Sequence, residues 1–314
     1  MVIASAANKV IEAKPKKFLN QFEPQKTLPT GASCVILSQK INPMKQIAFK
    51  PKEEIDLNDR LVNLYGSKLV GLYTDLEPLF EREGGIKPAL PLLLWLHDCE
   101  AYEKADVKVM IFGRETNNWN DGRRAHLPNG TYNFDLRTND DIIAEIMGPE
   151  GICDTYEAYC NYPEGRETNF TKRMKALVER LRHAMPGKKV EFVWNNIHKI
   201  GRGAAGQGHC TGQPTAEIRD IVRNRFNVVP DEIDILRPDV VIFLTGAAAD
   251  NAIADTFGVG NDAFAPVAPG LFLDRVAIPG IKYAARTIHP SRKSNEVLDS
   301  HFEALADDLA ATLK

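Results

Sequence analysis

The chain of 314 residues has no long apolar run, little cysteine and no excess of positive charge. No stretch of 18 residues is apolar throughout, so we expect no membrane span. Residues 1–7 are too short for the apolar core of a secretory signal peptide, and lysines follow them. These absences favour a protein that works in the cytoplasm and away from the membrane.

The five cysteines are scattered and form no C-x-x-C pair. Their odd number and spacing favour neither a disulfide framework nor a four-cysteine iron–sulfur cluster, and reduced thiols are the default in the cytosol. We therefore expect no metal and no cofactor. The five are Cys34, Cys99, Cys153, Cys160 and Cys210.

The formal net charge is −3 and the isoelectric point about 6.2. Proteins that bind nucleic acid often carry a basic balance, so the overall charge counts mildly against such a partner. A local basic groove on an acidic body can still steer DNA, because the field near the surface depends on the charges nearest to it.

The hydrophobic content of 44% is enough for the core of one sizeable domain. Residues 1–57 are rich in Pro, Lys and Gln and predict an irregular N-terminal extension, followed by a single α/β domain over residues 58–314. Strands that alternate with helices predict a parallel sheet with right-handed crossovers. Helical spacing of apolar residues predicts helices over residues 59–81, 87–104, 171–185, 215–226, 246–257 and 295–313, with one short helix near 140–147.

Polar side chains follow three of the four predicted strands, at the point where each strand ends. V-K-V-M-I-F-G at 107–113 leads to Glu115, V-E-F-V-W-N-N at 190–196 ends in two asparagines, and the run at 282–288 leads to His289 and Ser291. The fourth strand lies in L-R-P-D-V-V-I-F-L-T-G-A-A-A at 236–249. Because parallel strands end at one edge of a sheet, these side chains are expected to share a ligand site.

This order of elements over residues 105–312 resembles the uracil-DNA glycosylase superfamily. Gly113–Thr116 lies on the family's G-Q-D-P motif, Asn195 on the asparagine that reads the base, and His289–Ser291 on H-P-S. The resemblance implies a central four-stranded parallel sheet flanked by helices. It also implies a DNA glycosylase that flips out a pyrimidine and leaves an abasic site, with Glu115 and His289 as catalytic residues and Asn195 binding the base.

Three departures from the family's motif bear on the substrate. Glu115 is one methylene longer than the family's Asp, and Thr116 replaces a Pro. Asn117 stands where uracil-specific members carry an aromatic ring against C5 of the base. Asn117 and Asn118 could instead hydrogen-bond a C5 substituent. We therefore predict a C5-modified pyrimidine, such as glucosylated hydroxymethylcytosine of phage DNA, slightly ahead of uracil, with a role in phage defence.

Basic side chains near these motifs predict contacts to the backbone of single- or double-stranded DNA. Arg123 and Arg124 lie in the long 119–170 connection, and a solvent-exposed loop without a DNA contact explains them equally well. We expect a monomer with DNA as its partner and no membrane contact. The candidate DNA-binding residues are Lys199, Arg202, Ser291, Arg292, Lys293, Arg123 and Arg124.

A uracil-DNA repair glycosylase with the same chemistry is one alternative to excision of a modified base. Two further alternatives involve no base excision. The stretch G-R-G-A-A-G at 201–206 matches G-x-G-x-x-G and suggests a nucleotide-binding α/β enzyme, such as a dehydrogenase. Its context is poor, because the preceding strand ends well before Gly201 and no acidic residue ends the next strand. A glycosylase-like fold that only binds nucleic acid is the other alternative.

Overall fold

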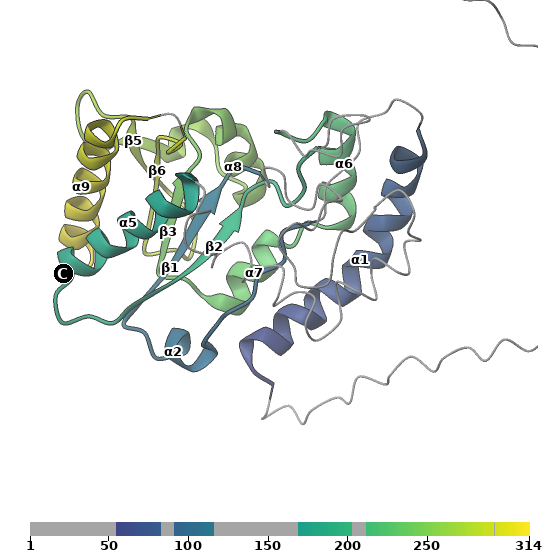
Figure 1. Cartoon of the computed structure of the whole chain (residues 1–314), viewed down its shortest axis with the longest axis horizontal. Helices are drawn as coiled ribbons and strands as arrows, with labels where there is room; N and C mark the ends of the chain where they lie inside the picture. The colour runs from purple at the N-terminus through teal and green to yellow at the C-terminus, as the bar shows by residue number, and fades with distance from the viewer. Residues whose placement is uncertain (1–54, 83–90, 116–168, 203–211, 292) are drawn as a thin grey trace, which may run out of the picture. The chain divides into compact units, whose positions relative to one another are not determined.

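The computed structural model describes residues 55–82, 91–115, 169–202, 212–291 and 293–314 (Figure 1). All of them belong to one compact unit, Lys50–Lys314. The predicted N-terminal extension falls almost wholly outside the described residues, as does the short helix near 140–147, so the domain boundary at residue 57 stays a prediction. In the described part of the chain, no helix is long and apolar enough to cross a membrane.

A mixed sheet runs through the centre of the described unit, in the order β2-β1-β3-β6-β5-β4. Neighbours among β2, β1, β3 and β6 are parallel, whereas β5 is antiparallel to β6 and β4 to β5. The α/β class is thus confirmed, and the predicted four-stranded parallel sheet is wrong. The strands are β1 (Val107–Gly113), β2 (Val190–Asn196), β3 (Val240–Leu244), β4 (Phe264–Pro266), β5 (Leu273–Val276) and β6 (Tyr283–Thr287).

The two additional strands form a hairpin that pairs with β6 through β5, and Arg286 on β6 adds side-chain contacts to it. Arg286 on β6 is only 6% exposed, and its guanidinium lies 2.6 Å from Asp274 and 3.9 Å from the ring centre of Phe272. A buried cation is stable only when it is paired, and here Asp274 and the ring of Phe272 supply its neighbours. Strands this short carry too little alternation for the sequence pattern to predict them.

Seven α-helices surround the sheet in the described part of the chain. Figure 1 shows α5 and α9 side by side on one side of the strands, with α1, α6 and α7 gathered on the other. The helices are α1 (Leu57–Glu81), α2 (Cys99–Glu103), α5 (Asn169–Ala184), α6 (Ala216–Arg225), α7 (Val229–Leu236), α8 (Asp250–Phe257) and α9 (Asn295–Thr312). Four predicted helices are confirmed as α1, α5, α6 and α9, and the prediction for 246–257 begins as a 3₁₀ turn before α8.

The predicted helix over residues 87–104 is wrong over the stretch 91–98, which forms no helix or strand. Alternate backbone N–H groups there bind acceptors outside the segment. Leu92 donates to the carbonyl of Lys199 at 2.8 Å, Leu94 to the hydroxyl of Tyr65 at 2.9 Å, and Leu96 to the side chain of Asn58 at 2.8 Å. These tertiary contacts outweigh helix propensity, and a helix forms only at Cys99–Glu103.

The sheet's register brings the predicted site residues to one edge. Gly113 at the end of β1 is paired with Asn196 at the end of β2, and Leu244 at the end of β3 with Thr287 at the end of β6. The backbone N–H of Gly246 donates to the carbonyl of Thr287 at 2.9 Å, so the exits of β3 and β6 stay together. This edge is where ligands bind in open parallel sheets.

Candidate active site

Glu115 lies two residues beyond β1 with its side chain only 8% exposed. Its Oε1 is 3.6 Å from a guanidinium nitrogen of Arg114, and its Oε2 is buried with no hydrogen-bond partner among the described residues. Burial raises the pKa of Glu115, and the nearby Arg114 opposes that rise. A buried carboxylate that leaves one oxygen unpaired is costly to fold and is available to a ligand.

His289 follows β6 and is held as a neutral imidazole. Burial, with a smaller contribution from Arg114, lowers the pKa of His289 to about 4. Its Nδ1 lies 3.2 Å from the backbone N–H of Ser291, which can only donate. We therefore assign the ring proton to Nε2, which makes that atom a donor at neutral pH.

The two asparagines at the end of β2 have opposite environments, although both are 0% exposed. Asn195 uses its whole amide inside the protein: its Nδ2 donates to Glu232 at 2.9 Å, and its Oδ1 accepts from the N–H of Asn196 at 2.8 Å and from Lys199 at 2.9 Å. Asn196 has neither its Oδ1 nor its Nδ2 bonded to any described residue. These contacts do not favour Asn195 as the residue that reads a base, and the amide without a partner among the described residues is that of Asn196.

Phe170 at the start of α5 completes the surroundings of Asn196. A Cβ at Gly113 would lie 2.5 Å from Oδ1 of Asn196 and 3.1 Å from the ring of Phe170, so only glycine leaves room for both. The ring of Phe170 is also 5.8 Å from the imidazole of His289, centre to centre. Phe170 thus links the exits of β1 and β2 to that of β6.

A second glycine lets the exits of β3 and β6 approach each other. Gly246 has a φ of +63°, which disfavours any residue with a Cβ. A Cβ there would also be in contact with the backbone N of His289 at 3.5 Å. The turn after β3 therefore packs directly against the backbone of His289.

Lys199 was expected to contact DNA phosphates, and the structure contradicts this. Its side chain is 2% exposed, and its ammonium lies 2.7 Å from Glu232 in the first turn of α7. Burial lowers the pKa of Lys199, and the carboxylate of Glu232 opposes the shift. Because the ammonium is buried and paired with Glu232, it is not accessible to a phosphate.

The remaining predicted residues divide into described and undescribed ones. Arg202, Ser291 and Lys293 are exposed and could meet a phosphate backbone. Five others lie outside the described residues, and the structure does not place them: Asn117, Asn118, Arg123, Arg124 and Arg292.

Most of the glycine-rich stretch at 201–212 also lies outside the described residues. Arg202 and Gly212, at its two ends, are joined by a backbone hydrogen bond of 3.2 Å. The next helix, α6, begins only at Ala216, and the side chain of its N-cap Thr215 already accepts a hydrogen bond from Ile218 N–H. A dinucleotide fingerprint opens its helix directly from the glycines, so this part of the structure does not favour that alternative.

His198 lines a cavity of about 470 Å³ between the β2 exit and helices α6, α7 and α8. Burial, together with Arg219 and Arg114, lowers the pKa of His198 to about 4. Its backbone N–H donates to the carbonyl of Arg114 at 2.8 Å, so the cavity borders the segment that carries Glu115. Within the described ranges, no group of three or more His, Cys, Asp or Glu side chains is arranged to hold a metal ion.

Sequence reasoning missed three contributors to this site. Asn196 was passed over for its neighbour because both stand at the end of the same strand. Phe170 lies far from the other motifs along the chain, where no pattern marks it. Glu232 belongs to α7, which was not predicted, although Pro230 followed by two acidic residues is a signal for the first turn of a helix.

The arrangement holds a carboxylate, a neutral imidazole and a carboxamide without described partners at one edge of the sheet, with the ring of Phe170 beside the imidazole and the carboxamide. An amide offers one acceptor and two donors, which suits the edge of a nucleobase. No protein-family model matches the chain, and a search of curated proteins finds no significant match.

Proposed function

We propose that the protein is a DNA glycosylase that flips out a pyrimidine and hydrolyses its N-glycosidic bond. The observation that carries this proposal is the pair of buried amide atoms of Asn196, beside Phe170, that have no hydrogen-bond partner in the part of the chain the structure describes. Buried polar groups are normally paired, and an open set at a sheet edge is explained by a ligand that supplies the missing partners. A flipped base offers both a flat face for Phe170 and an edge for Asn196.

The two titratable groups fit the charges that develop during excision. As the bond from C1′ to the base breaks, positive charge grows on the sugar and negative charge on the departing base. The Glu115 carboxylate would stabilise the sugar cation and orient the attacking water, as carboxylates do in glycoside hydrolysis. The Nε2–H of His289 would donate to the carbonyl oxygen of the leaving base.

DNA would bind to residues that remain exposed, since Lys199 is buried in an ion pair with Glu232. Two exposed cations lie close in sequence to the site residues: Arg202 after the β2 exit and Lys293 after His289. Ser291 adds an exposed hydroxyl. We propose that these groups contact phosphates, whereas the chemistry is confined to the sheet edge.

For the substrate we propose a C5-modified pyrimidine, such as glucosylated hydroxymethylcytosine, slightly ahead of uracil. Asn117 replaces the aromatic wall of uracil-specific enzymes, and a site built to hydrogen-bond a substituent rejects bases that lack one. An enzyme of this kind would attack foreign DNA and spare the host's own, which is a phage-defence role.

The experiment incubates the protein with uracil DNA, unmodified DNA and glucosylated phage DNA side by side. Abasic sites are then detected by alkaline strand cleavage. Cleavage only in glucosylated DNA supports both the activity and the substrate. Efficient base release from uracil DNA alone, unaffected by Asn117→Tyr, would show that uracil is the substrate and not a C5-modified pyrimidine. The absence of abasic sites in all three DNAs would refute the glycosylase activity.

A further inference from the structure

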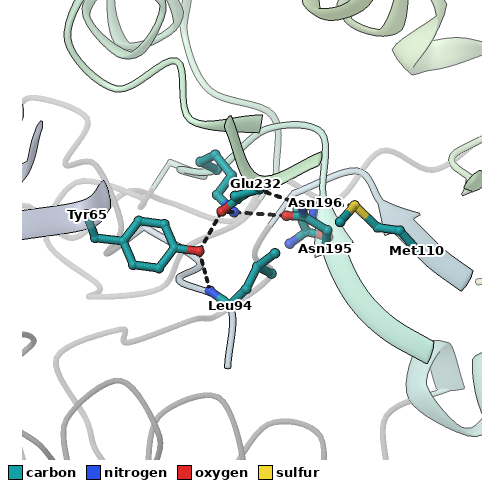
Figure 2. A network of polar contacts seen from close by, with 7 residues as sticks. Tyr65, Leu94, Met110, Asn195, Asn196 and Glu232 are labelled. Atoms are coloured by element: carbon teal, nitrogen blue, oxygen red, sulfur yellow. Dashed lines mark hydrogen bonds and ion pairs between the residues drawn. The ribbon is translucent and has the colours of Figure 1, made fainter. Parts of the chain in front are cut away.

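A buried polar network joins helix α1, helix α7 and the exit of β2. The ammonium of Lys199 lies 2.7 Å from Oε1 of Glu232, and Tyr65 donates to the same oxygen at 2.7 Å. Figure 2 shows Tyr65, Glu232 and Asn195 joined in a row, with Asn196 beside Asn195. The side chains of Lys199 and Glu232 are 2% and 0% exposed, so both charges are fully removed from water.

Stability alone does not account for this ion pair. Removing two charges from water costs several kcal/mol each, and a well-packed apolar pair of the same volume is often as stable or more so. The position of Glu232 in the first turn of α7 lowers the cost, since the helix dipole favours an anion there. The Lys199–Glu232 ion pair has a high desolvation cost, and its polar atoms are hydrogen-bonded. Its presence is better explained by the group that it orients.

What it orients is the amide of Asn195. The ammonium of Lys199 binds Oδ1 of Asn195 at 2.9 Å, and Glu232 accepts from Nδ2 at 2.9 Å. Turning the amide over would place its NH₂ against the ammonium and its oxygen against the carboxylate. The two charges therefore fix Oδ1 in the position where it accepts the backbone N–H of Asn196 at 2.8 Å.

The same segment is held from its other side by β1. The N–H of Ile197 donates to the carbonyl of Gly113 at 3.0 Å, and that of His198 to the carbonyl of Arg114 at 2.8 Å. Asn196 is thus fixed between the network on one side and the backbone that carries Glu115 on the other.

We propose that Lys199, Glu232 and Tyr65 are positioning residues that hold Asn196 in register with Glu115. They touch neither base nor sugar and act through Asn195. The proposal rests on the proposed function for its effect on excision, but the ordering of Asn196 that it requires can be measured without any substrate.

The test replaces both charges together, with Lys199→Met and Glu232→Gln in one protein, because a single replacement would leave an unpaired buried charge. We expect hydrogen exchange at the backbone N–H of Asn196 to accelerate at least about tenfold more than at neighbouring β2 amides. The excision rate constant should fall about tenfold to a hundredfold, with KM nearly unchanged, since small misplacements in a site cost that much. Tyr65→Phe should give the same pattern more weakly.

Tyr283→Phe is the matched control. Its hydroxyl also donates to a carboxylate, that of Asp308 at 2.9 Å, but Tyr283 stands at the start of β6, at the opposite end of the strand from His289. This variant should lower stability without changing exchange at Asn196 or the excision rate constant.

A double-mutant cycle decides between positioning and general support. In an Asn196→Ala background, the paired replacement should cost no further activity, because its effect passes through Asn196. An independent loss in that background, or unchanged exchange at Asn196 in the paired variant, would overturn the proposal. If the wild-type protein excises no base at all, the proposed function fails, and the exchange measurement alone still decides the positioning.

Discussion

Two buried polar clusters are centred on the neighbouring residues Asn195 and Asn196, and they differ in whether their polar atoms find partners. In the cluster around Asn195, amide, ammonium and carboxylate all find partners within the chain. In the cluster around Asn196, the amide and one oxygen of Glu115 find none among the residues the structure describes. Asn195 and Asn196 are both 0% exposed, so what distinguishes these two asparagines is whether their amide atoms have partners among the described residues. The comparison leads to four predictions.

The largest effect is expected from Glu115→Gln, which removes the charge of the open cluster. Excision should fall by roughly two or more orders of magnitude, while DNA binding is kept. Since burial raises the pKa of Glu115, the ionised carboxylate destabilises the fold at neutral pH. The variant should therefore unfold at a higher temperature at pH 7, as thermal denaturation will show. Wild-type turnover in this variant would remove Glu115 from the mechanism.

His289→Ala should lower excision by about a hundredfold, corresponding to roughly 3 kcal/mol for one lost donor to a developing oxyanion. Single-turnover rates on the preferred DNA measure this directly. A variant with lowered thermal stability and undiminished single-turnover rate would show that the histidine is only structural.

The two asparagines give the sharpest contrast. Asn195→Ala leaves Lys199 and Glu232 short of partners and should cost about 3 kcal/mol of unfolding free energy. Asn196→Ala removes amide atoms that have no partner among the described residues, so it should change stability by less than about 1 kcal/mol. It should nevertheless reduce excision by about tenfold to a hundredfold, a typical value for a bidentate base contact. Urea unfolding and excision rates on both variants test the contrast, and equal stability losses would contradict it.

The smallest effect concerns pH. Unfolded histidines titrate near 6.5, whereas His198 and His289 have pKa values of about 4 in the folded protein. Between those values the unfolded chain binds protons that the folded chain does not. These two residues therefore contribute their full stability above pH 6.5, and this contribution is lost as the pH falls towards 4.

The size of this loss should be on the order of 1 kcal/mol per histidine between pH 7 and pH 5, and urea unfolding at both values measures it. His198→Asn should make the dependence shallower while leaving His289 in place. A slope equal to the wild type's would mean that His198 is not held neutral by burial.

Much of the scaffold could be predicted from the sequence, because long amphipathic patterns such as α1, α5 and α9 are decided locally. Which asparagine is open could not be predicted in this way. Consecutive residues at a strand end point to different sides, and only the contacts of Asn195 with Glu232, from a helix that no pattern had indicated, show which side is closed. The non-helical stretch at 91–98 was missed for the same reason, since its hydrogen bonds go to Tyr65, Asn58 and the carbonyl of Lys199.

The bond between Tyr65 and Glu232 also bears on the order in which the protein folds. The two residues are 167 positions apart in the chain, whereas Lys199 and Glu232 are separated by only 33. Pairings between distant parts of a chain are slow to form, because the entropy of closing a long loop must be lost first. We therefore expect the first helix to dock late, onto a sheet that is already assembled. During refolding, the sheet would then appear before the competent site, and a chain whose first helix is undocked would look folded yet work poorly.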